Sequence, residues 1–422
     1  MVAKPKLRPA VSSPGRAKRQ REMKQMDAGE VMRQLRERGS ESGEISERHW
    51  GLSSSRPSAA VSFLLEKGLL ERTSNGRSKA GQRSGALRIN AGYGHVVGVD
   101  IGASNLRVAL ADMNGSVLGK WSASTKKTSS PDLVIEQIRT GVKYLLQRAS
   151  VPRRSLLAVA AGAPGITDGD AGVVVATSYL RGWKDVALRS LLESALRIPA
   201  AVENDVRMAA IGENWRGAAQ GIGDFVFLAI GTGIAAGVFA NGKLIHGADW
   251  TAGEIGYMHV PGGPEEAAKH RDPGSLESVI GGEGIRQQWL RGCGEAGTVV
   301  ARDLNATEIF ERARAGDELA ERVLNRSAKM LAYAVYNISL VLNCELFVLG
   351  GGVGMSQPLL DSTRQFLQEY TEPVRPKLAV SSLGPDAQLI GAIRLALNKA
   401  DSGIGLVAGG QPDSPRRLLL GI

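Results

Sequence analysis

The pattern of apolar and polar residues divides the chain near residue 92. Before this point, apolar residues recur every three or four positions, which is typical of amphipathic helices. Beyond it, short runs of consecutive apolar residues alternate with longer helical patterns, which is typical of an α/β domain with buried strands. The length of 422 residues also exceeds what one hydrophobic core usually holds, so the sequence predicts at least two domains.

The N-terminal pattern predicts three helices. The first has an apolar face around Val31 and ends at Gly39. A short second helix is expected over residues 44–50. The third begins near Pro57, which a helix tolerates only in its first turn, and ends at Gly68.

A basic hairpin is predicted to follow these helices, over Glu71 to Asn90, because Asn75-Gly76 is a tight-turn signal. Three helices and a basic hairpin are the plan of a winged helix-turn-helix domain, which we assign to residues 25–91. In such domains the third helix enters the major groove and the hairpin lies along the phosphates. The candidate DNA-binding residues are Ser55, Arg56 and Ser58 at the helix and Arg77, Lys79 and Arg83 on the hairpin.

Charge supports this interpretation because the net charge of +10 lies in one place. Residues 1–90 hold 19 Lys and Arg against 9 Asp and Glu, whereas the rest of the chain holds 33 of each. A basic module on a neutral body indicates a unit that binds a polyanion. The alternative is a helical dimerisation module whose charge has no such role. Residues 1–24 are expected to be a disordered basic tail, either a phosphate-binding arm or a solvated segment.

The cysteine content and the apolar runs of the sequence indicate the cellular compartment that we expect for the protein. The cysteines, Cys293 and Cys344, form neither a disulfide framework nor a metal-ligand spacing, which favours a reducing environment. The basic N-terminus is not followed by an apolar signal region, and no apolar run has the length of a membrane span. The sequence therefore predicts a cytoplasmic protein without a membrane partner.

Glycine-rich turns follow three predicted strands in the body. They are Asp100–Arg107, Ala229–Gly237 and Leu346–Val353. Glycines at such turns let backbone N–H groups approach phosphates. Taken singly, the second could be an ordinary hairpin turn and the third a tight strand-to-helix turn.

Three further motifs carry polar groups suited to a sugar. Ala161–Gly165 follows a predicted strand, and Val202–Asp205 ends in an Asn–Asp pair. An Asn–Asp pair offers complementary donors and acceptors to neighbouring hydroxyls, and a carboxylate can accept the proton of an attacking hydroxyl. Ala252–Tyr257 and the segment 268–277 add Glu254 and Glu277.

These motifs, in this order, resemble those of the repressor–ORF–kinase (ROK) family over roughly residues 30–398. The resemblance implies an α/β body with the actin-like ATPase/sugar kinase (ribonuclease H-like) fold, in two lobes. We expect the first lobe at residues 92–203, rejoined by a C-terminal helix at 386–398, the second and larger lobe at 204–385, and a tail at 399–422.

The resemblance also implies the roles of individual residues. Asp205 corresponds to the catalytic base of the family's kinases, and Asp100 to the residue that helps to hold the metal. The implied sugar contacts are Gly165, Asn204, Asp205, Glu254, Tyr257 and Glu277. The implied nucleotide contacts are Asp100, Gly102, Ser104, Gly231, Thr232, Gly233, Gly351 and Gly352.

The sequence departs from the family at three places, one of which puts Ala235 and Ala236 where the second glycine-rich turn usually has glycines. Ala103 and Ser104 stand where family kinases have Gly-Thr. The family's zinc ligands are also missing, because Tyr257 replaces a histidine, and Ala268, His270 and Ser275 replace three cysteines. Structural zinc needs four N or S ligands, so we predict that no zinc is bound. Tyr257 either faces the ligand or fills the space of the lost site.

The motifs and the family resemblance are consistent with two functions. The first is a transcriptional regulator of carbohydrate metabolism, a repressor by expectation, which binds an operator in double-stranded DNA and senses a sugar or sugar phosphate as a homodimer or homotetramer. The second is an ATP-dependent sugar kinase of the glucokinase type with Asp205 as general base, in which case ATP and Mg²⁺ are the cofactors. The N-terminal module and the altered phosphate loop favour the regulator.

Overall fold

The computed structural model describes residues 28–38, 44–46, 59–73, 86–125, 130–261, 274–295, 304–370 and 373–408. These residues belong to two compact units. The first unit spans Met1–His95, Asp112–Ser116 and Ala400–Ile422, and the second spans Val96–Ala111 and Val117–Lys399. No helix of the described part is long and apolar enough to cross a membrane.

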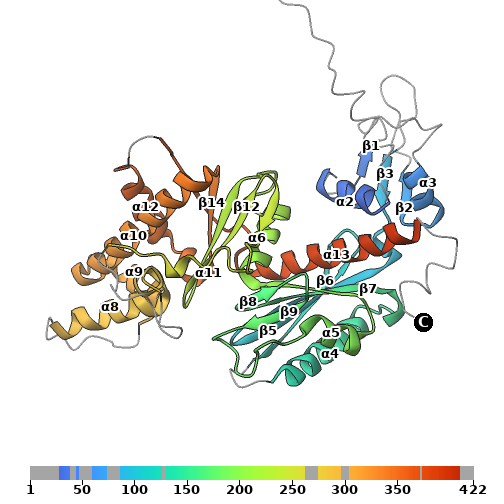
Figure 1. The fold of residues 1–422 in the computed structure, drawn as a ribbon, viewed down its shortest axis with the longest axis horizontal. Helices are drawn as coiled ribbons and strands as arrows, with labels where there is room; N and C mark the ends of the chain where they lie inside the picture. The colour runs from blue at the N-terminus through green and yellow to red at the C-terminus, as the bar shows by residue number, and fades with distance from the viewer. Residues whose placement is uncertain are drawn as a thin grey trace, which may run out of the picture. The chain divides into compact units, whose positions relative to one another are not determined.

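The first unit contains two described helices and a three-stranded antiparallel sheet (Figure 1). The sheet order is β1-β3-β2, and Met32, Leu35, Leu64 and Leu87 are fully buried between the helices and the sheet. Gly68 follows the second helix with a φ of 73°, a conformation that suits glycine at a helix end. The elements are α2 (Ala28–Arg38), β1 (Glu44–Ser46), α3 (Ala59–Glu66), β2 (Leu70–Thr73) and β3 (Ala86–Ile89).

The short helix predicted over 44–50 is wrong at residues 44–46. There the backbone pairs with β3, with Ile45 opposite Leu87. A pairing partner distant in the sequence therefore overrides the local helical pattern. Residues 47–58 and 74–85, which include all six candidate DNA-binding residues, lie outside the described residues, as does the predicted tail at 1–24.

The predicted C-terminal tail at 399–422 is wrong over its first part. The helix expected at 386–398 is α13 (Ala387–Ala408), which continues well past residue 398. Ala400, Asp401 and Ile404 are buried, so one face of this extension packs within the first unit. Residues beyond 408 lie outside the described part.

The second unit contains two five-stranded sheets with the same strand order. In each sheet the first strand of the lobe lies in the centre. The second and third strands follow on one side of it, and the fourth and fifth strands on the other. The first-lobe sheet comprises β4 (His95–Ile101), β5 (Asn105–Asp112), β6 (Val117–Ser124), β7 (Leu156–Ala163) and β10 (Ala200–Asn204), and the second-lobe sheet β11 (Phe225–Ile230), β12 (Ile234–Ala240), β13 (Lys243–Ile245), β14 (Leu346–Gly350) and β15 (Lys377–Val380).

Helices cover the first-lobe sheet on both faces. Val97 and Val99 of β4 face the core shared with α4 (Pro131–Arg148) and α5 (Leu188–Leu196). Gly98 points the other way, and a Cβ atom there would lie 2.9 Å from the Ile393 side chain of α13. Figure 1 shows α13 beside this sheet. A small hairpin of β8 (Ile166–Asp168) and β9 (Val173–Ala176) completes the lobe.

The second lobe holds the largest hydrophobic core of the described chain, with Trp289, Phe310 and Phe347 at its centre. The parallel strands β11, β14 and β15 support it. β12 pairs antiparallel with β11, and β13 pairs antiparallel with β12. The helices of this part are α6 (Asp205–Arg216), α7 (Glu277–Ile280), α8 (Gly282–Glu295), α9 (Ala306–Arg314), α10 (Glu318–Leu342), α11 (Gly351–Gly354) and α12 (Gln357–Leu367).

Candidate functional site

The Asn–Asp pair lies where β10 ends and α6 begins. The Asn204 side chain caps this helix, since its Oδ1 accepts from the N–H groups of Val206 (2.9 Å) and Arg207 (3.0 Å). Its Nδ2 donates to Gly165 O at 2.9 Å and to Asp205 Oδ1 at 3.2 Å. Both donors and both lone pairs of Asn204 are thus engaged, so a sugar hydroxyl would bind it by replacing one of these bonds.

Asp205 has the electrostatic character of a general base. Burial, followed by the nearby Asp100 carboxylate, raises the pKa of Asp205 to about 7. Its Oδ1 accepts hydrogen bonds from Asn204 and Val206, while Oδ2 has no hydrogen-bond partner among the described residues. A carboxylate with one fixed and one available oxygen, and a pKa near neutrality, can accept a proton from a bound hydroxyl.

A buried ion pair flanks the Asn–Asp pair, and it was not predicted from the sequence. Arg207 Nε donates to Glu203 Oε1 at 2.7 Å, and both side chains are almost fully buried. The other Arg207 nitrogens donate to Thr167 O and Trp250 O, each at 2.8 Å. Arg207 therefore ties the first-lobe hairpin to the loop that precedes Glu254.

Trp250 in that loop has a φ of 60°, which is unusual for a bulky residue and costs conformational energy. Its ring lies 4.7 Å from the His246 ring, and His246 Nε2 is 2.8 Å from Glu203 Oε2. His246 and Arg207, and the amide N–H of Asn204, lower the pKa of Glu203 against the effect of burial. The spacing of four residues between Glu203, near the end of β10, and Arg207, in the first turn of α6, was the available sequence signal for this network.

Acidic side chains gather at the mouth of the site. Glu277, at the start of α7, accepts a hydrogen bond from the Ile234 N–H at 3.1 Å. Burial and the neighbouring Glu277 raise the pKa of Glu254, although Arg207 opposes this shift. Tyr257 is 55% exposed, so it does not fill a buried space left by lost zinc ligands.

Tyr179 joins this group from the segment between β9 and α5, and the sequence analysis missed it. Burial, and then Glu277, Asp205 and Glu254, raise its pKa to about 12. The structure thus brings together Asp205, Glu254, Glu277 and Tyr179, which come from both lobes.

The first glycine-rich turn is a tight hairpin between β4 and β5. The Gly102 N–H donates to Asn105 O at 2.9 Å. Neither Gly102 nor Ala103 has a positive φ, so alanine at position 103 causes no backbone strain. Ser104 is exposed, and its carbonyl accepts from the Thr125 N–H at 2.8 Å.

Asp100, at the end of this strand, is held by Arg107. The Arg107 guanidinium donates to Asp100 Oδ2 at 2.8 Å through Nε and lies 2.7 Å from it through Nη2. The described residues contain no group of three or more His, Cys, Asp or Glu side chains able to hold a metal ion. A cation already occupies the carboxylate that the family resemblance assigns to metal binding, so these residues fit Mg²⁺ poorly.

The other two glycine-rich turns lie at the ends of the adjacent parallel strands β11 and β14. The Gly231 N–H donates to Gly233 O at 2.9 Å, so Thr232 sits at the tip of a closed turn. Gly351 has a φ of 78°, and a Cβ atom there would lie 2.4 Å from Ile230 O. A Cβ atom at Gly231 or Gly352 would meet no atom within 4 Å, so a ligand could approach both backbones.

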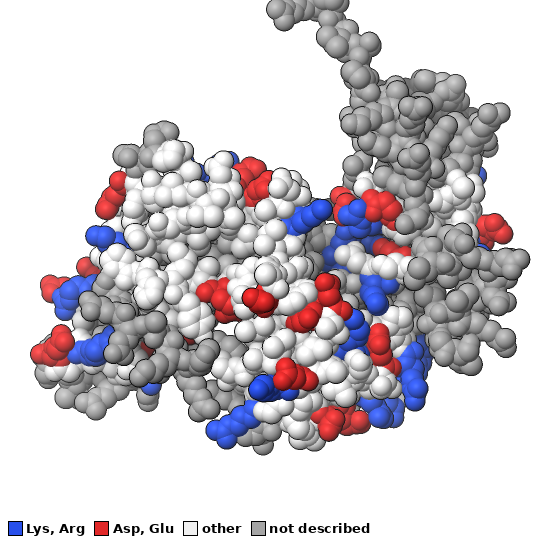
Figure 2. Space-filling model, viewed as in Figure 1, with Lys and Arg blue, Asp and Glu red and all other residues white. Residues whose placement is uncertain are grey.

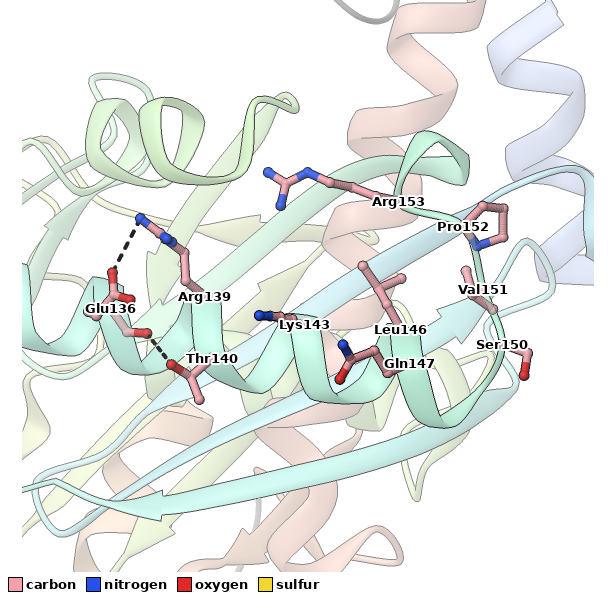
Figure 3. Close-up of a pocket in the computed structure, with 10 residues that line it drawn as sticks. All are labelled: Glu136, Arg139, Thr140, Lys143, Leu146, Gln147, Ser150, Val151, Pro152 and Arg153. Atoms are coloured by element: carbon pink, nitrogen blue, oxygen red, sulfur yellow. Dashed lines mark hydrogen bonds and ion pairs between the residues drawn. The ribbon is translucent and has the colours of Figure 1, made fainter.

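A separate groove of about 780 Å³ lies along α4 and the loop that follows it (Figure 3). Arg139 pairs there with Glu136 at 3.4 Å, and Arg153 donates to Leu196 O at 3.1 Å. None of the predicted ligand-binding residues lines this groove. The candidate site is therefore the acidic cluster with its neighbouring glycine-rich turns.

Two lobes of the same strand order, with phosphate-loop turns and an Asn–Asp pair, define the actin-like sugar kinase fold. The family model that describes the ROK family matches residues 96–399, so the chain belongs to the ROK family.

Its relatives include kinases and repressors. The chain is 32% identical over 309 residues to a glucokinase of Halalkalibacterium halodurans, covering 70% of this chain and 92% of that protein. It is 22% identical over 350 residues to the xylose repressor of Caldicellulosiruptor bescii, covering 79% of this chain and 86% of the repressor.

A solved structure extends the likeness to the N-terminal unit. A ROK family transcriptional regulator, described as a homologue of the E. coli MLC protein, has a TM-score of 0.75 and 23% identity, and covers 92% of this chain and 99% of its own. A ROK hexokinase from Thermus thermophilus has a TM-score of 0.60 and 28% identity, covering 73% of this chain and 100% of its own. The fold of the N-terminal region is therefore compatible with a DNA-binding domain.

Proposed function

We propose that the chain is a DNA-binding transcriptional regulator of carbohydrate metabolism whose kinase-like body senses a sugar. The observation that carries this proposal is the N-terminal unit, with its helices, three-stranded sheet and excess positive charge. A sugar kinase needs no such unit. The xylose repressor's similarity also extends over more of the chain than that of the glucokinase.

The charge distribution supports a DNA contact through the N-terminal unit. On the face drawn in Figure 2, the described Lys and Arg side chains of the body are interspersed with Asp and Glu. A body with balanced charge is a poor polyanion surface, whereas the first 90 residues hold 19 basic against 9 acidic side chains. DNA affinity should therefore depend on residues of the first unit.

The body supplies the sensor. Carboxylates accept hydrogen bonds from sugar hydroxyls, and Asp205, Glu254 and Glu277 meet at one place. The N-terminal N–H groups of α6 are already bonded to Asn204 and Asp205, so that helix end offers little to a phosphate. This arrangement favours an uncharged sugar over a sugar phosphate as the effector.

The proposal is tested by the salt dependence of DNA affinity. Replacing Arg77, Lys79 and Arg83 by Gln should reduce the slope of log affinity against log salt by roughly 0.9 for each lost phosphate contact. The matched control replaces Arg314, Arg322 and Lys329, which are exposed on α9 and α10 of the body. An equal change in both variants would place the phosphate contacts outside the predicted hairpin.

A second candidate function is sugar phosphorylation, which the raised pKa of Asp205 favours. In that case Asp205 Oδ2 would accept the proton of the attacking sugar hydroxyl, and the turns at Gly102 and Gly231 would face the nucleotide. A phosphoryl-transfer assay with ATP, Mg²⁺ and a sugar panel tests it. Turnover that disappears in Asp205→Asn would establish a bifunctional protein.

A further inference from the structure

Tyr179 is fixed in position by the residues on either side of it. Leu180 and Trp183 are buried in the first-lobe core, at 2% and 1% exposure. The Tyr179 N–H donates to Thr177 Oγ1 at 3.1 Å. A partly exposed side chain on such an anchored segment has a defined direction, as a ligand-contacting group requires.

The Tyr179 hydroxyl reaches the second lobe beside Gly233. A Cβ atom at Gly233 would lie 3.3 Å from Tyr179 Oη and 2.2 Å from Glu277 Oε2. The Glu277 carboxylate therefore takes the place that a side chain at residue 233 would need, and the Tyr179 hydroxyl lies beside it. Asp205 and Glu254 are also near enough to act electrostatically on this hydroxyl.

The groups around the Tyr179 hydroxyl suit a hydroxyl-bearing ligand. The pKa of about 12 keeps the Tyr179 hydroxyl protonated at neutral pH, so it is a hydrogen-bond donor. Oη has no hydrogen-bond partner among the described residues. The nearby groups that act on it electrostatically are three carboxylates and the Tyr257 hydroxyl, which are suited to a neutral sugar and repel an anion.

We propose that Tyr179 is a specificity-determining residue of the site, and that its hydroxyl donates a hydrogen bond to a ligand oxygen that also contacts the Glu277 carboxylate. This inference rests on the proposed sugar-sensing function. The ligand class is an uncharged sugar with a free hydroxyl at that position. Because Tyr179 belongs to the first lobe and Glu277 to the second, one ligand hydroxyl would contact both lobes.

The test compares the full-length wild type with Tyr179→Phe, which keeps the ring and removes the donor. Both are titrated calorimetrically with D-glucose, D-xylose and N-acetyl-D-mannosamine, and then with the monodeoxy derivatives of the sugar that the wild type binds most tightly. Tyr179→Phe should bind that sugar about tenfold more weakly. One monodeoxy derivative should bind both proteins equally, because it lacks the oxygen that Tyr179 contacts.

The control variant is Tyr144→Phe on α4. Tyr144 is 45% exposed and lies away from the acidic cluster, so this substitution should leave sugar affinity unchanged. If wild type and Tyr179→Phe bind the sugar with equal affinity, the proposed role of Tyr179 is wrong, whereas the proposed sugar sensing is not affected. An equal loss with every monodeoxy derivative would also overturn it, since that result indicates a general structural effect. If the wild type binds none of the three sugars, the sensing function is contradicted together with this inference.

Discussion

Arg107 and Asp100 form an ion pair at the base of the first glycine-rich turn, with Nη2 and Oδ2 2.7 Å apart. Arg107 thus supplies a positive charge where the family resemblance places a metal-binding carboxylate. Burial raises the pKa of Asp100, and Arg107 counteracts this shift. Arg107 therefore favours the charged form of Asp100 but does not fully offset the cost of burying it.

Removing only the cation should leave that charge unpaired. Arg107→Met is expected to lower the free energy of unfolding by about 3 kcal/mol. The double variant Asp100→Asn/Arg107→Met should lose less, because both charges are then absent. Chemical denaturation of the four proteins of the cycle measures this coupling, and a loss in the double variant equal to the sum of the two single losses would show that the two side chains are not coupled.

Asp205 should make stability depend on pH. Its pKa rises to about 7 in the folded protein, so the folded state holds a proton that the unfolded state has already released between about pH 4 and 7. Stability is therefore lost as the pH rises through this window. Asp205→Asn lacks this titrating group and should not lose stability in this way. The unfolding free energy of Asp205→Asn minus that of wild type should therefore be larger at pH 8 than at pH 5, by about 2 kcal/mol or more.

Denaturation at the two pH values measures this difference directly. Glu283→Gln, at the exposed start of α8, is the matched control and should show no such change. A constant difference between wild type and Asp205→Asn across the range would contradict the raised pKa.

Two adjacent glycines at the end of β14 should respond differently to alanine. Gly351→Ala places a methyl group 2.4 Å from Ile230 O at a φ of 78°, so it should destabilise the protein by about 2 kcal/mol or more. Gly352→Ala meets no atom within 4 Å and should change stability by about 0.5 kcal/mol or less. The melting temperatures of both variants test this difference. Similar decreases in the two variants would contradict the described conformation of the turn.

Much of the body could be predicted from sequence because its strands are continuous apolar runs. The glycine-rich turns predicted to follow strands, at Asp100–Arg107, Ala229–Gly237 and Leu346–Val353, do follow β4, β11 and β14. Asp205, Glu254 and Glu277 were identified because each lies in a motif. Tyr179 and Arg207 were missed because their roles depend on contacts with distant residues, Gly233 for one and Thr167 for the other.

The errors at β1 and α13 have the same origin. Residues 44–46 become a strand through pairing with β3, and the end of α13 is helical because it packs within the first unit. A single sequence does not reveal either partner. The ROK family resemblance was confirmed by the family match.

A second buried ion pair should matter for the stability of the first unit. Arg36 of α2 pairs with Asp401 of α13, and both side chains are almost fully buried. Arg36 Nε also donates to Met113 O at 2.9 Å. Asp401→Ala should leave Arg36 uncompensated, destabilise the first unit by about 3 kcal/mol and weaken DNA binding.

Glu311→Gln is the matched control, because it removes a charge from the exposed pair with Arg314. It should change stability by about 0.5 kcal/mol or less. Hydrogen exchange of α2, together with DNA affinity, reports the effect of Asp401→Ala. Unchanged exchange in α2 would contradict a stabilising role for the C-terminal helix in this unit.

The most direct test of the proposed regulator measures DNA binding by the full-length protein with and without sugar. A DNA site is first selected from a randomised pool, and its affinity is then measured while D-glucose, D-xylose and N-acetyl-D-mannosamine are added in turn. The proposal predicts a palindromic site bound in preference to random DNA, with an affinity that at least one sugar changes about tenfold or more. Binding without sequence preference, or selective binding that no sugar alters, would contradict it.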